Sequence, residues 1–574
     1  MPASTRPWRG WLLALCLLCL AGTALAAGHA GRKAATGSVA QAKAGSGVAA
    51  SEAALVAAQR IVLHRNAGSG SPVLASVGIP FPPGVLDDPQ QLRILDAKGN
   101  EVASAVKVML RWHFKDGSIR AVRVQFRAAL AGGEETFYFA VGKPRREEIA
   151  GWPYETGLVD GPDGLRVPMA LGTLTSEWLC ASLIAGPQQP ASPNEAYARY
   201  VSRQFEWARA LPVDDYSAWL FDRPTALYKA YLRTGRFDYL QAADLSYRFY
   251  MKYIKRDGAP ESPVCAGGWT FDDKVCDVKY VYIEPILLSV ALAGNDGDHD
   301  EALVDKMLTL WSNGGWNRPP GPYAQPQAYF TERLAGLGLV ETVSAYELTG
   351  SKRALAMIDE RLGWLYEHQR NNPDHLGDDG SWRNSWNLHE GDDWKPQADV
   401  RGTSPWMSEN IIDGLWHAWL VTGDRRIPDM VTGFGRYLER YGWIGPELLV
   451  QPHDWRNNCS GPDGQIAWYW SSVHAPQAAL EAIQESEGWY SDGHNVELAL
   501  PVAAAYYFET DPARIAAYKR RLDRLASSYN TACAAIDDTK RRFNWNNRGS
   551  GVVQWMIRQP PGSGTALLAR RGGP

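Results

Sequence analysis

Acidic, basic and aromatic residues gather where long predicted loops lead into predicted helices. These junctions lie at 277–284, 329–333, 406–410 and 491–497, and a further loop ends near residue 475. Carboxyl, ammonium, guanidinium, imidazole and phenol groups that converge in a cleft can move protons and stabilise developing charge. The candidate catalytic residues are Lys279, Tyr280, Glu332, Arg333, Glu409, His474 and His494.

Two bond-cleaving reactions fit these residue types. β-Elimination from a uronic acid needs a cation for the carboxylate, a base for the C5 proton and an acid for the leaving oxygen. The candidates for these roles, in that order, are Arg333 or Lys279, His494 or His474, and Tyr280 or Tyr469. Glycoside hydrolysis needs two carboxyl groups, for which we take Glu332 and Glu409, with Asp413 and Glu497 in reserve. The alternative is that these acids only cap helix N-termini.

The tryptophans suggest what such a cleft would bind. The chain has 24 Trp and only 14 Phe, and many of the indoles fall in the long loops rather than in apolar helices. Indole faces pack on sugar rings, and amide side chains bind hydroxyl groups, although some of these indoles could simply anchor loops. The predicted substrate-binding residues are Trp269, Trp316, Trp382, Asn384, Trp386, Trp394, Trp455 and Trp470. Trp416 and Trp419 are instead predicted to lie in a helical core.

The elements that would position these residues follow a repeat. Apolar helical segments end at Thr234-Gly235, Thr349-Gly350 and Thr422-Gly423, with weaker versions at Ala293-Gly294 and Thr510-Asp511. Glycine closes a helix in the left-handed conformation, so each pair marks a tight turn between two helices. Because the long loops would then share the opposite face, residues 191–541 predict an (α/α) toroid of five to six hairpins, with an irregular bundle as the alternative.

Residues 59–190 have a different pattern, typical of an antiparallel β domain. Short apolar runs are separated by turn residues at 96–100 and 115–118. In the run 119–130, Val122, Val124 and Phe126 alternate with polar residues, which predicts a half-buried strand. The fold class is therefore multidomain α+β.

The first 26 residues have the pattern of a secretory signal, with two arginines before a short apolar run and Ala24-Leu25-Ala26 after it. A flexible linker over 27–58 and an irregular tail over 542–574 are expected. The protein is therefore predicted to be secreted or periplasmic, and no stretch is long enough to span a bilayer. In that compartment Cys265–Cys276 is the expected disulfide, Cys459–Cys533 is possible, and Cys180 is left over.

Composition limits the partners. With 59 basic and 63 acidic residues the net charge is −4, so no broad cationic surface for nucleic acid is expected. Cysteine and histidine spacing predicts no metal site, and the acidic run 295–300 lacks the last glutamate of a calcium loop. No cofactor is expected. The predicted partner is a polysaccharide or oligosaccharide, and the sequence leaves the oligomeric state open.

The turns of the β domain resemble those of a known family. Gly78–Gly84, Leu92–Gly99 and Arg111-Trp112 with Asp116–Arg120 resemble the N-terminal β domain of the exo-rhamnogalacturonan lyase-like proteins. The resemblance covers about 70 residues and implies a helical toroid that degrades acidic polysaccharide by β-elimination. It assigns no catalytic residue to this chain.

The sequence thus predicts a carbohydrate-active enzyme. A lyase acting on a uronate-containing polysaccharide leads because of the resemblance, and a glycoside hydrolase with a carboxyl pair follows from the residues alone. A polysaccharide-binding protein without catalysis is the third possibility.

Overall fold

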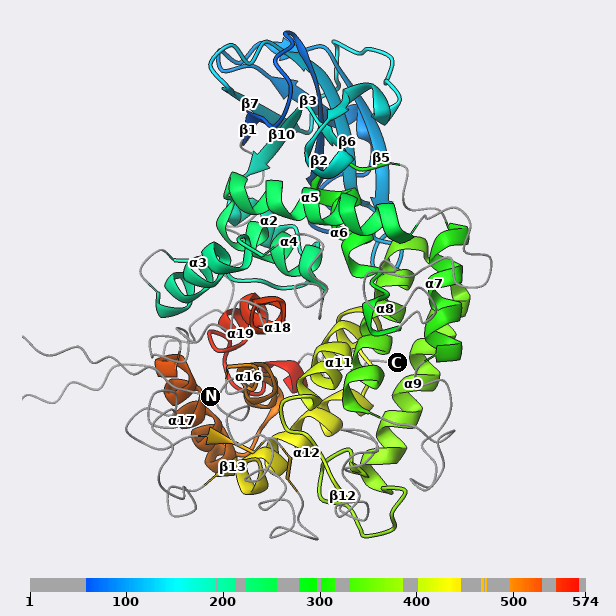
Figure 1. Ribbon diagram of the computed structural model, residues 1–574, viewed down its shortest axis with the longest axis vertical. Coiled ribbons are helices and arrows are strands. Elements are labelled where there is room, and N and C mark those ends of the chain that lie inside the picture. The colour runs from blue at the N-terminus through cyan, green and yellow to red at the C-terminus, as the bar shows by residue number, and fades with distance from the viewer. Residues whose placement is uncertain are drawn as a thin grey trace, which may run out of the picture. The chain divides into compact units, whose positions relative to one another are not determined.

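Strands come first along the chain and helices follow. The computed structural model describes residues 58–192, 195–211, 222–254, 278–296, 301–314, 331–385, 401–444, 466–468, 470–471, 496–528 and 543–566. All of them belong to one unit of the chain, Ala53–Pro574. The structure is mixed α+β, with an antiparallel β part over 59–174 and a helical region after it (Figure 1). Among the described residues, no helix has the length and apolarity needed to cross a bilayer.

The β part contains two main sheets whose strands all pair antiparallel. The five-stranded sheet has the order β10-β1-β7-β3-β4 and the three-stranded sheet the order β2-β6-β5, while β8 and β9 pair with each other. The ring centroids of Phe126 on β6 and Phe137 on β7 are 4.8 Å apart, so the two sheets share one apolar core. The strands are β1 (Gln59–Arg65), β2 (Val73–Pro80), β3 (Leu92–Leu95), β4 (Glu101–Val102), β5 (Ser104–Arg111), β6 (Ile119–Ala128), β7 (Glu134–Val141), β8 (Leu158–Asp160), β9 (Arg166–Pro168) and β10 (Ala170–Leu174).

Two details of this part differ from the prediction. Strand β6 is buried on both faces rather than one, because Arg123 is ion-paired to Asp296 of the helical region and Gln125 bonds to Ser76. The segment that holds Cys180 lies within the predicted β domain, 59–190, but forms helix α2 (Ser176–Ala181). Cys180 itself is a free, buried thiol, in agreement with the prediction that it belongs to neither disulfide.

Helical hairpins form the rest of the described chain. Helices α4 (Arg223–Thr234), α8 (Glu332–Thr349) and α11 (Ser408–Thr422) each end at a glycine with φ between 64° and 70°, as the Thr-Gly repeat predicts. Their partners are α5 (Phe237–Ile254), α9 (Lys352–Arg370) and α12 (Arg426–Tyr441). Helix α16 (Ala499–Phe508) likewise contacts α17 (Pro512–Ser528). Helix α6 (Glu284–Leu292) is followed by α7 (Glu301–Gly314), which contacts α8.

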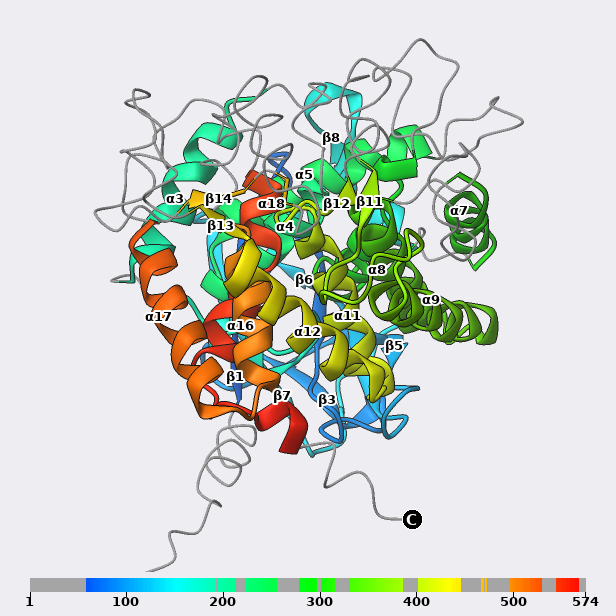
Figure 2. The ribbon, with the colours of Figure 1, turned by 90° about the horizontal axis from the view of Figure 1, so that it is seen from below.

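The first helix of each pair is the buried one. Every residue of α6 and α16 is buried, whereas α9, α12 and α17 have one polar, exposed face. The buried helices contact each other in the series α4, α6, α8, α11 and α16 (Figure 1). Figure 2 shows the outer helices α9 and α17 beside their buried partners. The prediction of helical hairpins is therefore confirmed for α4 with α5, α8 with α9, α11 with α12 and α16 with α17.

The prediction of an irregular tail from residue 542 is wrong for residues 543–556. This segment forms α18 (Phe543–Arg548) and α19 (Ser550–Met556). Helix α19 contacts α16, and α18 contacts both α19 and α4. Val552, Val553 and Met556 are buried in the same core as α11 and α16. The remaining described helix, α3 (Ala196–Ala208), contacts α17 and α18.

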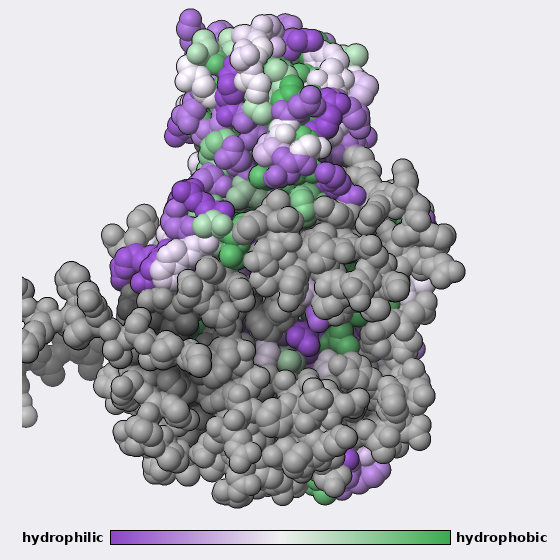
Figure 3. Space-filling model, viewed as in Figure 1, coloured by the Kyte–Doolittle hydropathy of each residue, from purple (hydrophilic) through white to green (hydrophobic). Residues whose placement is uncertain are grey.

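Buried polar contacts join the β part to the helices. The side chain of Arg120 on β6 is fully buried, donates to Glu347 of α8 at 2.8 Å and stacks on Trp112 at 4.4 Å. Gly78 on β2 faces the backbone of Ala291 so closely that a Cβ there would overlap it. Most residues seen on the surface of the β part are hydrophilic, and its apolar side chains lie in the hydrophobic core (Figure 3).

We expect Arg120→Met to destabilise the protein by about 3 kcal/mol, because it leaves the largely buried Glu347 carboxylate without its cation. Urea unfolding would measure this. Lys519→Met removes an exposed pair to Asp523 on α17 and should cost at most about 0.5 kcal/mol. Equal effects of the two substitutions would contradict the role given to Arg120.

Candidate functional site

Nine ionisable side chains meet where the buried helices converge, and we call them the central cluster. All nine are at least nine-tenths buried. They come from the starts or inner faces of α4, α6, α8, α11 and α16 and from the end of α18. The cluster consists of Asp222, Lys229, Glu284, Glu341, Glu409, Asp413, His417, Glu497 and Arg548.

Glu284 is the hub of the ion pairs. Its Oε1 lies 2.7 Å from Nζ of Lys229, and its Oε2 accepts from Nη2 of Arg548 at 3.0 Å. Nε2 of His417 is 3.8 Å from the same carboxylate. Burial alone would raise the pKa of Glu284, but Lys229, His417 and Arg548 together lower it to about 2. Glu284 is therefore ionised throughout the neutral range.

Arg548 also reaches Asp413, so one guanidinium joins two carboxylates. Its Nη2 is 3.3 Å from Oδ2 of Asp413, and His417 Nε2 is 3.6 Å from the other oxygen. Burial works against the charge of Arg548, yet Glu284 and Asp413 raise its pKa above the ordinary value. Nε and Nη1 of this guanidinium have no hydrogen-bond partner among the residues that the structure describes.

The pKa values of Asp222 and Glu341 are shifted in the opposite direction, upwards. Burial, with Glu284 nearby, raises the pKa of Asp222 to about 6, and burial together with Asp222 raises the pKa of Glu341 well above its usual range. Asp222 caps α4 through Thr225 N with a φ of 67°, a conformation that costs a non-glycine residue energy. Glu341 accepts from the backbone N–H groups of Ile283 and Glu284, which fixes the start of α6.

Glu409, Asp413 and His417 lie one turn apart on the same face of α11. Their exposed fractions are 4, 5 and 7%, against 0% for Asp222 and Glu341, so the α11 face is the side of the cluster nearest solvent. Burial first, and then Asp413 and Glu497, raise the pKa of Glu409 well above its usual range. Burial and the acidic neighbours therefore favour the protonated form of Glu409, which lies beside an ion-paired carboxylate. In Figure 3, hydrophilic and hydrophobic residues are visible side by side in the middle of the helical region.

Glu332, the predicted partner of Glu409, has a different environment. It is completely buried, and its carboxylate accepts from Asn384 Nδ2 at 2.8 Å, Thr403 Oγ1 at 2.7 Å and Ser404 N at 2.9 Å. Thr403 Oγ1 is in turn 3.2 Å from Oγ of Ser408, the residue before Glu409. Glu332 and Asn384 thus hold the chain that leads into α11, which is a positioning role.

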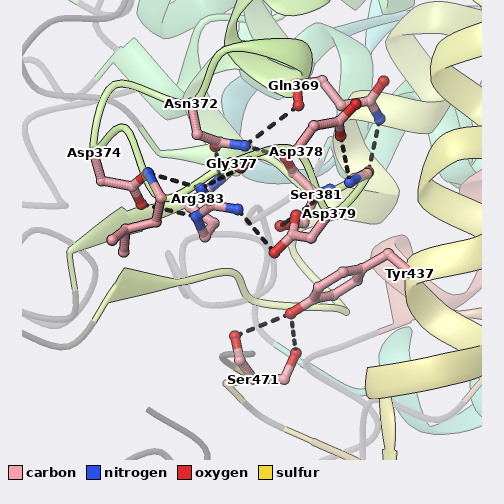
Figure 4. Close-up of polar contacts among 12 residues, drawn as sticks. Gln369, Asn372, Asp374, Gly377, Asp378, Asp379, Ser381, Arg383, Tyr437 and Ser471 are labelled. Carbon is pink, nitrogen blue, oxygen red and sulfur yellow. Dashed lines mark hydrogen bonds and ion pairs between the residues drawn. The ribbon is translucent and has the colours of Figure 1, made fainter. Parts of the chain in front are cut away.

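The neighbouring loop 371–383 is fixed by a buried arginine (Figure 4). Arg383 binds Asp374 through Nε at 2.8 Å and Nη2 at 2.7 Å, and its Nη1 is 2.9 Å from Asp379. Asn372 accepts from the backbone N–H of Arg383 at 2.9 Å. These contacts hold both ends of the loop. They therefore fix the position of Asn384, the next residue, whose side chain donates to Glu332. These carboxylates take a guanidinium as their cation. Within the described part of the chain, no group of three or more His, Cys, Asp or Glu side chains is arranged to hold a metal ion.

The remaining described candidates are not members of the central cluster. Trp382 is fully buried, donates to Leu365 O at 3.0 Å and packs on Phe434, so it supports the loop from inside the core. Trp470 is also fully buried in the core. Tyr280 is buried, Lys279 is half-buried with its ammonium 5.5 Å from the Tyr280 ring, and Arg333 is half-buried at the start of α8.

Other predicted site residues fall outside the described residues. These are His474, His494, Trp269, Trp316, Trp386, Trp394 and Trp455, together with the cysteines of both predicted disulfides and Tyr469. Trp416 and Trp419 lie in the core, as predicted.

Sequence reasoning selected Glu409, Asp413 and Glu497 and missed most of the cluster. The signal it could have used is an isolated charge within a helix that is apolar all round. Lys229, Glu341 and His417 each interrupt such a run, at 226–232, 337–343 and 411–420. Because buried charges persist only when paired, such interruptions predict a shared interior site.

The chain was compared with family models, with curated proteins and with solved structures, and none matches it. The assignment of function therefore depends on the geometry of the cluster.

We expect Asp222→Asn to reduce the pH dependence of stability. A carboxyl whose pKa is higher in the folded protein, here about 6 against 3.8, binds its proton more tightly when folded. Its contribution is fully present below about pH 4 and is lost as the pH rises through about 6. Asparagine keeps the cap to Thr225 but cannot ionise, so the wild-type protein should lose on the order of 1–3 kcal/mol more than the variant between pH 4 and 7.5.

Urea unfolding at the two pH values measures this difference. Asp523→Asn, at an exposed position of α17, is the control and should keep the wild-type pH dependence. A wild-type profile in Asp222→Asn would contradict the assignment.

Proposed function

We propose that the chain is a secreted or periplasmic enzyme that cleaves polysaccharide, and that its helical region is an (α/α) toroid. The contact series α4, α6, α8, α11, α16, α19, α18 and back to α4 supports the toroid, because it returns to its first member. Acidic residues lie within two positions of the first residue of five helices of this series, so the N-termini of these helices would bring the acids together at one end. They are Asp222, Glu284, Glu332, Glu409 and Glu497.

The observation that carries the proposal is the contrast between two carboxyl groups on α11. Burial and acidic neighbours raise the pKa of Glu409 and so favour its protonated form, while Asp413, one turn away, is ion-paired to Arg548. Glycoside hydrolysis requires this division, in which one carboxyl protonates the leaving oxygen and the other acts as base or nucleophile. We assign the acid role to Glu409 and the carboxylate role to Asp413. The predicted pair of Glu332 and Glu409 is thereby replaced.

The network around the pair would keep these roles separate. Arg548 and His417 stabilise the negative charge of Asp413, and Glu284 neutralises Lys229 and Arg548 in turn. Glu332 would set the position of Glu409 by holding residues 403–408. The aromatic residues predicted in the long loops would supply the sugar-binding surface.

β-Elimination is the second candidate function. It is favoured by the cations of the cluster, since Lys229, Arg548 and His417 are the residue types that could hold a uronate carboxylate and take a proton. It also follows from the resemblance to the exo-rhamnogalacturonan lyase-like proteins. In that case a cation would have to leave Glu284 or Asp413 to bind the substrate.

We expect Glu409→Gln to lower kcat on the cleaved polysaccharide by at least about 10²-fold with little change in KM, because the amide keeps the shape of the side chain but donates no acidic proton. Release of reducing ends measures the rate. Glu360→Gln, at an exposed position of α9, is the matched control and should keep the wild-type rate. A wild-type rate in Glu409→Gln would remove Glu409 from the acid role.

The products should separate the two reactions. Hydrolysis gives reducing ends without absorbance near 235 nm, whereas elimination leaves an unsaturated uronate that absorbs there. We expect reducing ends alone when neutral, amino-sugar and uronate polysaccharides are each incubated with the protein. Absorbance rising in step with the reducing ends would select the lyase, and no cleavage of any polymer would favour a binding protein.

A further inference from the structure

A groove on the β part lies outside the central cluster, and we call it the β groove. Its volume is about 760 Å³, which is within the range of sites that bind small molecules. No residue of the central cluster is among those that line it. The lining consists of residues 105–108 of β5, the segment 148–153, and Arg123, Gln125 and Asp296.

Hydrogen bonds hold the segment 148–153 against the sheet at two points. The backbone N–H and C=O of Ser104 on β5 bond to residues 147 and 149, at 3.0 and 3.3 Å. Further along, the backbone N–H of Trp152 donates to Oε1 of Gln125 on β6 at 3.0 Å. The segment is therefore attached to both strands, and the groove beside it has a fixed shape.

The same hydrogen bonds show which backbone groups of β5 face the groove. Strand β5 is at the edge of its sheet, and alternate residues of an edge strand point their N–H and C=O away from the neighbouring strand. Since the backbone groups of Ser104 point away from β6, those of Val106, two residues on, point the same way. Val106 therefore offers one donor and one acceptor to a ligand. A peptide strand would have little room, because Ser104 is already bonded and the register shifts after Val108.

Positive charge exceeds negative charge at the β groove. Oδ1 of Asp296 is 2.6 Å from Nζ of Lys107, and its Oδ2 is 2.5 Å from Nη1 of Arg123, so two cations share one carboxylate. Burial alone would raise the pKa of Asp296, but these two partners lower it, so the carboxylate is ionised. The side chain of Lys107 is 54% exposed. Glu148, the other acid that lines the groove, pairs with Arg145 at 3.2 Å.

Arg127 adds a further positive charge beside the groove. It follows Arg123 by four residues on β6, so the two side chains lie on the same face of the sheet. Its exposed guanidinium lies 5.2 Å from the ring centre of Trp152 and makes no ion pair with a residue that the structure describes. Lys107 is opposite Arg123 on β5, so the backbone positions of Lys107 and Arg127 are roughly 13 Å apart at about 3.3 Å per residue. One small anion cannot reach both cations, whereas a chain with repeated anionic groups can.

We propose that the β groove binds an acidic oligosaccharide, with carboxylates of the glycan at Lys107 and Arg127 and a sugar ring against Trp152. The indole supplies an apolar face, and the backbone of Val106 supplies partners for hydroxyl groups. This binding site goes beyond the proposed function, since it needs no bond cleavage. It would hold an acidic polymer on the β part whichever reaction the helical region catalyses.

Calorimetry with three hexamers tests the proposal. They are a hexamer of galacturonate, its fully methyl-esterified and therefore uncharged counterpart, and hexaglutamate, each titrated into the Glu409→Gln protein, which lacks the proposed acid. We expect the galacturonate hexamer to bind at least 10-fold more tightly than the other two, with an affinity that falls as salt rises from 50 to 300 mM. Equal or tighter binding of the ester, or no binding of the galacturonate hexamer, would overturn the proposal. Equal or tighter binding of hexaglutamate would assign the groove to an acidic peptide instead.

A double variant locates the binding. Lys107→Gln with Arg127→Gln removes two exposed cations, leaves the ion pair between Asp296 and β6, and should weaken binding of the galacturonate hexamer at least 10-fold. Lys352→Gln with Arg520→Gln, at exposed positions of α9 and α17, makes the same change of charge and should keep the affinity of the parent protein. Equal losses in the two double variants would indicate a general effect of net charge, and an unchanged affinity in the first would place the binding elsewhere. Either result would reject the β groove as the site.

The two proposals fail in different ways. Cleavage that depends on Glu409, without binding at Lys107 and Arg127, would keep the proposed function and reject the β groove. Binding of the galacturonate hexamer that depends on these two cations, without cleavage of any polymer, would do the reverse.

Discussion

The helical region depends on neutralising one buried carboxylate. Glu284 begins α6 in an interior where an isolated ionised group would be very costly, and its partners come from three other helices, namely Lys229 on α4, His417 on α11 and Arg548 on α18. Loss of any partner would leave charge without compensation. The ion pairs therefore restrain how these helices are placed relative to one another, beyond what apolar packing does.

Close contacts between backbones also fix the relative positions of these helices. Gly336 on α8 lies against the backbone of Asn410 on α11 with no room for a side chain, which brings the first turns of these helices together. Glu332 starts one of these turns, and Glu409 lies in the other. The hydrogen bonds of Glu332 to Thr403 and Ser404 then fix the segment before α11. Two acids at one junction therefore have different environments, because Glu332 accepts several hydrogen bonds whereas burial and acidic neighbours raise the pKa of Glu409.

The sequence predicts periodic features well and interior chemistry poorly. The strands, the Thr-Gly turns and the acids at helix starts follow from local patterns, and the structure contains them. The roles of those acids depend on distant residues, because Glu332 is satisfied by residues 384, 403 and 404, while the state of Glu409 follows from Asp413 and Glu497. No local pattern separates these two glutamates.

The sequence also led to a wrong prediction of the role of a loop tryptophan. Trp382 lies in a polar, loop-like stretch that suggested a sugar platform, yet its indole is in the core and the polar residues around it, above all Arg383 and Asp374, tie the loop. The arginine after it was an equally visible signal. A buried loop needs internal partners for its polar groups, and alternating tryptophan and arginine can provide that anchoring.

The separation of Glu284 and Arg548 by 264 residues has a consequence for biosynthesis. A chain emerging from the ribosome contains α6 and its carboxylate long before α18 has been synthesised. Until then, the negative charge of Glu284 lacks one of its cationic partners. Contacts of such long range are made late and slowly. The charged interior is therefore completed only once α18 has been synthesised, and before that point the carboxylates of Glu284 and Asp413 would lack the guanidinium that joins them.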